Sequence, residues 1–354
     1  MFLREKENKK RRQITIKDVA EKAGVSYSTV SRALNDYPGT NEQTKAMVKK
    51  IAQEMGYTAN ELARSLVTKR SQTVGFILPD LSNPFFTDIL SAINKEVENN
   101  GYDLLICETH WQAEKEKSEL EMLMKKQVDG VLLYPAEVIG EDRLLKNNKP
   151  TVIFDESPNA IDEVTDYSFI AVNNIESGYL AVSHALEYGY RKIVYLGGPS
   201  ISNSNNKRLA GIGIRLAEEK LSLDPCDHPY LEGDYTLESG YDRTRSLLSS
   251  FREDIDCFIC ANDLIALGCM SAVEDSGFKI GGEIGVIGFD DIDYAGLPQI
   301  QLTTVRIPRY EMGQLGVINL MKMLDVNSSE SEINLVKTTM LYPNIIIRNT
   351  TKRR

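Results

Sequence analysis

Polar side chains with the chemistry to contact nucleic acid gather near the N-terminus, in the run TIKDVAEKAGVSYSTVSRALN at residues 15–35. Tyr27, Ser28 and Arg32 follow a break at Gly24 and lie on the polar side of an amphipathic pattern. The fork of an Arg guanidinium can bind guanine through two hydrogen bonds, and small hydroxyls suit phosphates or base edges. The pattern therefore predicts a surface that contacts nucleic acid; the alternative is a solvated helical hairpin.

Two short helices are needed to position those side chains. Ser26 is a good N-cap, because its hydroxyl can accept from the free backbone N–H groups of a first turn, and it predicts a helix at 27–34. An amphipathic segment precedes Gly24, and a third, supporting helix is expected at 43–55. Two short helices joined by a tight turn with Gly at its start are typical of a helix-turn-helix. The apolar residues expected between the helices are Val19, Ala20, Ala23, Val25, Val30, Ala33 and Leu34.

Charge separates this end of the chain from the rest. The 354 residues carry a net charge of −10, yet residues 1–71 contain 15 Lys and Arg against 8 Asp and Glu, a net charge of +7. The remaining residues contain 26 against 43, a net charge of −17. A basic head on an acidic body is the distribution that a DNA-binding module on a separate sensor domain requires. The hydrophobic fraction of 42% is enough for a substantial globular core.

After residue 71, apolar runs alternate with amphipathic segments. The run at 73–78 is apolar throughout, as in a strand that is buried on both faces. Alternating strands and helices predict open parallel sheets with helices on both faces, and the length suffices for two such lobes. Strands are expected at 73–78, 102–107, 130–134, 151–154, 169–172, 192–196, 257–260 and 284–289, and helices at 85–99, 113–126, 141–147, 177–188, 207–220, 237–250 and 264–276.

The run VSYSTVSRALN, the helix expected at 43–55 and the following GYTANELARSL closely resemble the DNA-binding headpiece of the lactose repressor and galactose repressor family. The resemblance covers nearly the whole chain after residue 13. It implies a transcriptional regulator, expected to be a repressor, that binds pseudo-palindromic operator DNA as a homodimer. Residues 14–59 are then the headpiece, and residues 1–13 are a basic arm or a solvated tail, expected to be disordered.

The resemblance also implies specific DNA contacts. Residues 60–71 correspond to the family's hinge helix and linker, and that helix orders only on operator DNA. Leu66 falls where the family places a leucine wedge between base pairs of the minor groove, although a plain linker is the alternative. The implied DNA-binding residues are Thr15, Ser26, Tyr27, Ser28, Thr29, Ser31, Arg32, Asn35, Tyr57, Asn60, Ala63, Arg64 and Leu66.

Residues 72–354 resemble the family's effector-binding and dimerisation core, an α/β architecture of two parallel-sheet lobes like that of a periplasmic sugar-binding protein. The effector is expected between the lobes, where the carboxyl ends of the strands meet. The implied crossovers lie near 171–174, 304–308 and 333–337, with lobe one at about 72–171 plus 306–335 and lobe two at about 172–305 plus 336–348.

Polar residues directly after expected strands are candidates for that cleft. A carboxylate or amide there can hold two sugar hydroxyls, and an Arg fork can hold two oxygens. The segment GGPSISNSNNKRLAG is similar to the family segment that clamps the effector, and the AND and FDD motifs match its amide and its first carboxylate. For Asp263, an N-cap is the favoured interpretation. The implied effector-binding residues are Phe85, Asp155, Ser204, Arg208, Asn262 and Asp290.

Three further residues could contribute to the cleft. Phe86 could stack on a ligand or pack at a helix start, and Trp111, the only Trp, could edge the cleft. Arg309 falls where some sugar-responsive family members carry an aromatic residue, so it could favour a phosphorylated or acidic effector. We therefore expect a small sugar or sugar phosphate without assigning its identity.

Other classes of protein fit less well. Cys257 and Cys260 have zinc-ribbon spacing without a second pair, the three histidines are dispersed, and neither a cofactor nor a metal is expected. The odd count of five cysteines, with no export signal or membrane-spanning run, predicts reduced thiols in a cytoplasmic protein. The sequence contains neither a GxGxxG motif at a strand-to-helix turn nor a nucleophile–base set, so an enzyme is not expected. A free sugar-binding protein would lack residues 14–66. The remaining alternative is a member of the same family controlled by a protein partner such as a phosphocarrier.

Overall fold

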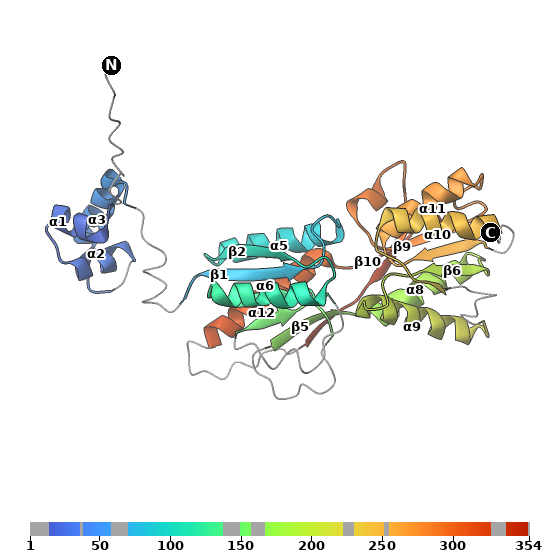
Figure 1. Ribbon diagram of the computed structural model, residues 1–354, viewed down its shortest axis with the longest axis horizontal. Helices are drawn as coiled ribbons and strands as arrows, with labels where there is room; N and C mark the ends of the chain where they lie inside the picture. The colour runs from blue at the N-terminus through green and yellow to red at the C-terminus, as the bar shows by residue number, and fades with distance from the viewer. Residues whose placement is uncertain are drawn as a thin grey trace, which may run out of the picture. The chain divides into compact units, whose positions relative to one another are not determined.

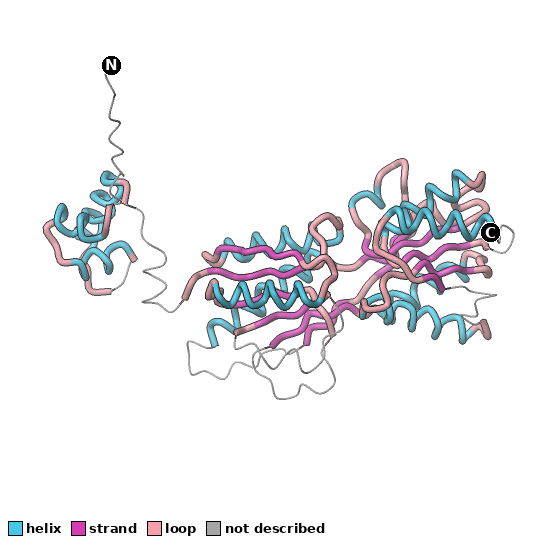
Figure 2. Tube along the Cα trace, viewed as in Figure 1, coloured by secondary structure: helices cyan, strands magenta, loops and turns pink. Residues whose placement is uncertain are grey.

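The computed structural model describes residues 14–35, 38–57, 70–136, 149–156, 167–221, 230–250, 255–326 and 338–352. The chain divides into two compact units, Met1–Ser71 and Gln72–Arg354 (Figure 1). The described part of the first unit is helical, and the second unit contains two sheets flanked by helices (Figure 2). The expected fold class, a helical headpiece and a two-lobed α/β core, is confirmed.

The first unit contains three helices: α1 (Ile16–Ala23), α2 (Tyr27–Leu34) and α3 (Glu42–Met55). Each begins at a side-chain cap, because Thr15, Ser26 and Asn41 accept a hydrogen bond from the N–H group three residues on. α1 ends at Gly24, whose φ of 65° lies in the left-handed region that Gly adopts without steric cost. The helix expected at 27–34 is thus confirmed to the residue.

The apolar residues between these helices form a small core. The buried side chains are Val19, Ala20, Val30, Ala33, Val48 and Ala52. Ala23, Val25 and Leu34 pack partly buried against them. The amphipathic pattern therefore identified the packing face correctly, which leaves the opposite face of α2 to solvent.

The second unit contains two six-stranded sheets. Their strands are β1 (Thr73–Leu78), β2 (Asp103–Glu108), β3 (Gly130–Leu133), β4 (Thr151–Ile153), β5 (Tyr167–Val172), β6 (Ile193–Leu196), β7 (Tyr230–Leu231), β8 (Cys257–Cys260), β9 (Gly285–Asp290), β10 (Thr303–Arg306), β11 (Thr338–Leu341) and β12 (Asn344–Ile346). Lobe one has the order β11-β5-β4-β3-β1-β2, and lobe two has the order β12-β10-β9-β8-β6-β7. Among the described strands every pairing is parallel except that of β10 with β12.

Helices cover both faces of each sheet (Figure 1). They are α5 (Phe85–Asn99), α6 (Ala113–Lys125), α8 (Asn174–Glu187), α9 (Asn203–Glu218), α10 (Leu237–Ser250), α11 (Asp263–Asp275) and α12 (Arg309–Val326), with a short 3-10 turn, η1, at Asp293–Gly296. Successive strand residues point to opposite faces, so Phe76 packs under α5 and α12 whereas Ile77 packs with Leu123 of α6. In lobe two, α8 packs against α9 and α10 against α11.

The chain crosses between the lobes three times. It enters α8 after β5, it enters α12 after β10, and Tyr342 and Pro343 join β11 to β12. The third crossover expected at 333–337 lies outside the described residues. β11 pairs with β5 in lobe one, so the assignment of residues 338–341 to lobe two was wrong. The reason is that β5 is otherwise the last strand of its sheet, and β11 covers its open edge.

Most expected elements agree with the structure within a few residues. The largest difference is at α9, which begins at Asn203 rather than at 207, because Ser202 accepts from the N–H group of Asn205 and caps the helix there. The helix expected at 141–147 lies outside the described residues. α12, η1 and the strands β7, β10, β11 and β12 were not expected from the alternation of apolar runs.

Candidate functional site

The face of the headpiece that is predicted to contact DNA is exposed. Tyr27 has 54% of its surface exposed, and Ser28 and Arg32 are also exposed. The hydroxyl of Ser26 lies 2.8 Å from the hydroxyls of Ser28 and Thr29, so these three polar groups cluster at the start of α2. An aromatic ring, hydroxyls and a guanidinium are thus accessible, and these are groups that contact bases and phosphates.

Other residues implied as DNA contacts have structural roles in the headpiece. Thr15 forms a capping box with Asp18, and the side-chain amide of Asn35 donates to the carbonyl of Ser31 at 2.8 Å. Tyr57 packs partly buried against the headpiece core. The remaining residues implied for the hinge, Asn60, Ala63, Arg64 and Leu66, lie outside the described residues, and all the DNA contacts stay predictions.

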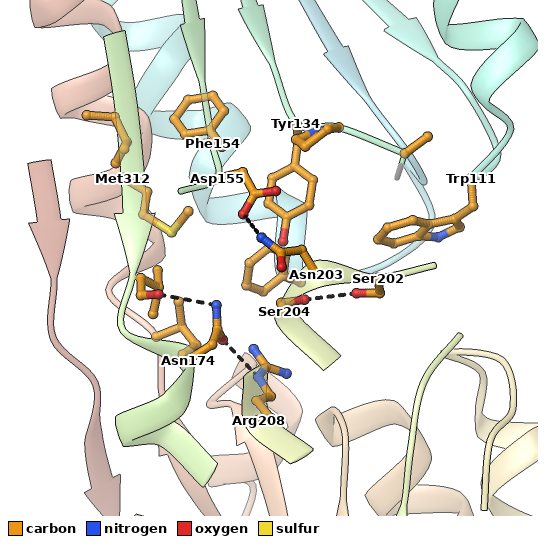
Figure 3. Close-up of a pocket in the computed structure, with 16 residues that line it drawn as sticks. Trp111, Tyr134, Phe154, Asp155, Asn174, Ser202, Asn203, Ser204, Arg208 and Met312 are labelled. Carbon is orange, nitrogen blue, oxygen red and sulfur yellow. Dashed lines mark hydrogen bonds between the residues drawn. The ribbon is translucent and has the colours of Figure 1, made fainter. Parts of the chain in front are cut away.

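In the core, side chains from both lobes enclose a cleft (Figure 3). The cleft has an empty volume of about 530 Å³, which is open to solvent, and it adjoins a second space of about 310 Å³. The two spaces share the lining residues Phe85, Trp111, Tyr134, Ser204 and Arg208. All six residues predicted to bind effector line one or both of them: Phe85, Asp155, Ser204, Arg208, Asn262 and Asp290.

Arg208 of α9 is the buried polar centre of this site. Only 5% of its surface is exposed. Its Nε donates to Asn174 at 3.1 Å, one terminal nitrogen donates to the carbonyl of Ala261, and the other lies 3.4 Å from a carboxylate oxygen of Asp290. The guanidinium also stacks over the ring of Phe289, with 4.6 Å between its central carbon and the ring centroid. These four contacts hold the fork in a single orientation at the cleft.

The carboxylate of Asp290 is buried beside that fork. Burial raises the pKa of Asp290, and the positive charges of Arg208 and Arg309 offset part of the rise. Its backbone φ of 102° is in the left-handed region, which a residue other than Gly adopts only when its surroundings hold it there.

Asp155, which follows β4 in lobe one, forms a hydrogen bond directly with a residue of lobe two. The side-chain amide of Asn203 donates to its carboxylate at 2.7 Å (Figure 3). Next to it, Glu156 forms an ion pair with Lys207 of α9. Burial raises the pKa of Asp155, and hydrogen bonds from Glu156 N–H and Asn203 offset part of that rise. The two lobes are therefore linked by protein side chains at one end of the cleft.

Four aromatic side chains of lobe one line the cleft or the space that adjoins it and are called the aromatic wall: Phe85, Phe86, Trp111 and Tyr134. Phe85 and Phe86 meet Tyr134 edge to face, at centroid distances of 5.9 and 5.0 Å. Trp111 of lobe one lies 5.4 Å from the ring of Tyr235 of lobe two, in a tilted arrangement. The interpretation of Trp111 as a residue at the cleft is therefore confirmed. Phe86 packs in the core, as one of its two interpretations had it, with 2% of its surface exposed. It also lines the smaller space, and its stacking on a ligand stays a prediction.

Two expectations need correction. Asn262, rather than Asp263, caps α11: its side-chain oxygen accepts from Ile265 N–H at 2.8 Å. Asp263 is instead fully buried and accepts from Ile292 N–H at 2.9 Å and from the Thr304 hydroxyl at 2.6 Å. The reason is that β10 and the turn after β9 supply donors that a sequence pattern does not reveal.

Arg309 is the second correction. It lines neither described space, and its guanidinium donates to the carbonyls of Pro84 and Asp291 at 3.3 and 2.9 Å and pairs with Asp88 at 2.8 Å. Because these protein groups occupy its fork, the hypothesis that Arg309 selects an acidic effector loses its basis.

Sequence reasoning missed several lining residues: Tyr134, Asn174, Ser202, Asn203 and Tyr235. Tyr134 and Asn174 follow β3 and β5 closely, so the rule that polar residues after strands reach the cleft would have found them. Ser202 and Asn203 lie in the segment already singled out around Arg208. Tyr235 had no such signal, because β7 is only two residues long.

The described residues contain no group of three or more His, Cys, Asp or Glu that could hold a metal ion. The described cysteines, Cys107, Cys257, Cys260 and Cys269, are buried thiols. No described helix combines the length and the apolar character needed to cross a membrane.

Two family descriptions match the chain. "Bacterial regulatory proteins, lacI family" covers residues 15–60, and "Periplasmic binding proteins and sugar binding domain of LacI family" covers residues 71–345. The chain is 31% identical over 345 residues to the HTH-type transcriptional repressor PurR of Pasteurella multocida, which covers 96% of this chain and 99% of that protein. A PurR repressor of Haemophilus influenzae is 31% identical over 342 residues, with coverages of 96% and 98%.

Solved structures agree with this relationship. The lac repressor dimer bound to operator and the anti-inducer ONPF matches with a TM-score of 0.84 at 26% identity, covering 96% of this chain and 100% of that one. A complex of the transcriptional regulator CelR with cellobiose, at 24% identity, shows the same fold with a TM-score of 0.68 over 95% of this chain and 99% of that one. The chain therefore belongs to the LacI family of bacterial regulatory proteins, as a DNA-binding transcriptional repressor with an effector-binding core.

Proposed function

We propose that this repressor is a cytoplasmic homodimer without enzymatic activity, and that a small, neutral polyhydroxyl molecule, most simply a sugar, controls its operator affinity. The observation that carries the proposal is the buried Arg208–Asp290 pair facing an aromatic wall across the cleft. Carboxylate, amide and guanidinium groups can bond the hydroxyls of such a ligand, while aromatic rings cover its apolar faces. The family description that matches residues 71–345, which names a sugar binding domain, supports this class of ligand.

The charge of the cleft favours a neutral ligand over a sugar phosphate. The charged residues that line the two described spaces are Asp155, Arg208 and Asp290, which leaves a formal excess of one negative charge. Arg208 already pairs with Asp290, and Arg309 is occupied elsewhere. A phosphate dianion would therefore meet the carboxylates of Asp155 and Asp290 without an unpaired cation among the lining residues described, which is unfavourable in a site of low polarity.

The ligand can control operator affinity because it contacts residues of both lobes. A ligand held by Asp155 and by Arg208 binds one lobe arrangement better than another, and only that difference in affinity can shift the equilibrium between them. Coupling of this kind is typically about 1–3 kcal/mol. A protein partner such as a phosphocarrier would need an exposed surface rather than these buried polar groups.

The test is a thermal-shift screen of sugars, sugar phosphates and purines on the full chain, followed by Arg208→Lys. Lys lacks the planar fork, so the shift given by the best sugar should be lost while operator binding without ligand persists. Arg215→Lys on the same helix, whose guanidinium pairs with Glu218 and Glu219, is the matched control and should keep the response. A normal dose response in Arg208→Lys would contradict the cleft assignment, and the protein-partner alternative would move ahead.

DNA recognition is tested in the headpiece. Arg32→Ala should cost about 1–3 kcal/mol of operator affinity and relax preference at one position of each half-site. Lys50→Ala removes the same charge from the exposed side of α3 and should not change sequence preference. If Arg32→Ala weakens all sequences equally, Arg32 contacts phosphate rather than a base.

The dimer is required because two recognition helices must read two half-sites on one face of DNA. Sedimentation at micromolar concentration, with and without DNA, should give twice the chain mass of 39.7 kDa. A monomer under both conditions would refute the dimer.

A further inference from the structure

The turn that presents Asp290 to Arg208 contains two consecutive residues in left-handed conformation. Asp290 has φ 102° and Asp291 has φ 54°, and neither is Gly. Such a backbone is costly and persists only where neighbouring groups over-determine it. The Asp290 carboxylate lies 3.4 Å from Arg208, so any relaxation of this turn moves a group at the centre of the proposed effector site.

The side chain of Asp291 lines neither described space and is held by two arginines. One carboxylate oxygen accepts from Arg306 Nε at 2.7 Å, and the other accepts from Arg348 Nη2 at 2.7 Å. The side chain is only 7% exposed. Its backbone is fixed as well, because the N–H group of Asp291 donates to the Thr304 hydroxyl at 3.3 Å. The two charge-assisted hydrogen bonds of the Asp291 carboxylate therefore stabilise the strained turn, and bonds of this type are stronger than neutral hydrogen bonds.

The same residue connects the turn to lobe one. Its carbonyl accepts from Arg309 Nη2 at 2.9 Å, and Arg309 also donates to the carbonyl of Pro84, immediately before Phe85 at the cleft. Arg306 is the last residue of β10 and Arg309 the first of α12, so the contacts of Asp291 lie on both sides of the second crossover.

We infer that Asp291 is a positioning residue of the effector site: held by Arg306 and Arg348, it keeps Asp290 directed at Arg208 and joins that turn, through Arg309, to the aromatic wall of lobe one. This inference rests on the proposed function of the cleft. It assigns a role to the second carboxylate of the FDD motif that contact with a ligand does not explain, since Asp291 lines neither described space.

The experiment compares Asp291→Asn with Asp293→Asn in the full chain. Asn keeps the shape and the backbone bonds of residue 291 but removes the charge, whereas Asp293 is an exposed carboxylate in the same loop. Hydrogen exchange without ligand reports on the turn after β9. Fluorescence of Trp111, the only Trp, which lines both spaces, reports binding of three probes: D-ribose, cellobiose and glucose 6-phosphate.

In Asp291→Asn, exchange should accelerate in the turn after β9 but not in the sheets, and the affinity for the best probe should fall about tenfold, as for the loss of charge-assisted bonds. Asp293→Asn should behave like the wild type. Arg306→Met, at a side chain that is 50% exposed, should weaken probe binding by a smaller factor. The double variant should be no worse than Asp291→Asn, because both act through one interaction.

Two results would overturn the inference: a probe affinity in Asp291→Asn within twofold of the wild type, or faster exchange spread over both sheets with a lower melting temperature, which indicates a purely stabilising role. If Asp291→Asn does not fold, Arg306→Met alone decides by the same two readouts. If no probe changes Trp111 fluorescence in the wild type, the proposed ligand class fails, and exchange in the turn still decides the role of Asp291.

Discussion

The two lobes of the core share a strand order but bring different chemistry to the cleft. Numbered within its own lobe, each sheet runs second, first, third, fourth and fifth strand, followed by a strand from the C-terminal segment. Lobe one contributes most of the rings, among them Phe85, Trp111 and Tyr134, together with the carboxylate of Asp155. Lobe two contributes the paired side chains of Arg208 and Asp290, together with the ring of Tyr235. The shared fold thus creates the cleft, and the side chains at the strand ends decide what binds there.

The lobes also differ in how closely their helices approach. In lobe two, a Cβ added at Gly211 of α9 would lie 1.9 Å from the carbonyl oxygen of Ile175 in α8, and one at Gly268 of α11 equally close to that of Leu237 in α10. In lobe one, the tightest comparable position is Gly313 of α12, at 2.4 Å from a backbone carbonyl of α5. Backbones in contact cannot yield by a rotamer change, so lobe two should be the less tolerant lobe.

The largest effect is expected from Gly211→Ala. The added methyl must separate α8 from α9, which should lower the free energy of unfolding by about 3 kcal/mol. Because Arg208 lies one turn earlier on α9, effector binding should weaken as well. Gly313→Ala should cost less and leave effector binding closer to normal. Gly282→Ala, with no atom nearer than 3.6 Å, is the control and should stay within about 0.5 kcal/mol. Denaturant unfolding measures all three, and equal costs at Gly211 and Gly282 would contradict the packing argument.

Acid should act on lobe two through His184. Burial lowers the pKa of this imidazole from 6.5 to about 4, and its Nε2 lies 2.8 Å from the hydroxyl of Thr351. Between these two pH values the unfolded chain binds the proton and the folded chain does not. The contribution of neutral His184 to the free energy of unfolding is therefore fully present above pH 6.5. It declines as pH falls towards 4, by about 1.4 kcal/mol for each pH unit.

The measurement is the unfolding free energy across that pH window for the wild type and His184→Gln. Gln cannot gain the proton, so its profile should be flatter by the stated slope. Parallel profiles would show that His184 contributes nothing to the acid sensitivity. Exchange of the α8 amides should rise before that of α5 if the effect belongs to lobe two alone.

The aromatic contribution of lobe one is tested at Trp111. Trp111→Ala removes the ring that meets Tyr235 across the cleft and should weaken sugar binding about tenfold. Trp111→Phe retains an aromatic face and should lose much less. Calorimetric titration measures both variants; equal losses would mean that the indole edge, rather than a stacking face, is what the ligand uses.

The smallest effect on stability is expected from Asp155→Asn. Burial raises the pKa of this carboxyl above its usual value of 3.8. The folded chain therefore holds the proton to higher pH than the unfolded chain does, and the wild type loses stability as pH rises above 3.8. Asn can still accept from Asn203 but carries no charge, so the variant should be more stable at neutral pH by about 0.5 kcal/mol. Thermal melts at pH 3 and pH 7 would refute this if the difference between the proteins did not grow with pH. The variant should also bind the sugar more weakly, since the carboxylate of lobe one is gone.

Much of the fold and of the site followed from local pattern. The helix at Tyr27–Leu34 was expected to the residue because its cap, Ser26, and its apolar spacing lie within a few positions of each other. The strands Thr73–Leu78 and Cys257–Cys260 were expected equally well, since continuous apolar runs mark strands buried on both faces. Resemblance to the family implied six effector residues, and all six line the cleft or the space that adjoins it.

The partners of those side chains were decided only by the tertiary structure. The sequence alone does not bring Asp155 to Asn203, Arg309 to Asp291, or Thr304 to Asp263, because each pair joins two different elements or loops of the chain. Nor does it show that β11 covers the edge of β5, which depends on which edge remains open after the other strands have paired. Helix caps and hydrophobic periodicity depend on residues that are close together in the sequence. The partner of a buried donor or acceptor depends instead on which group the completed fold brings within hydrogen-bonding distance.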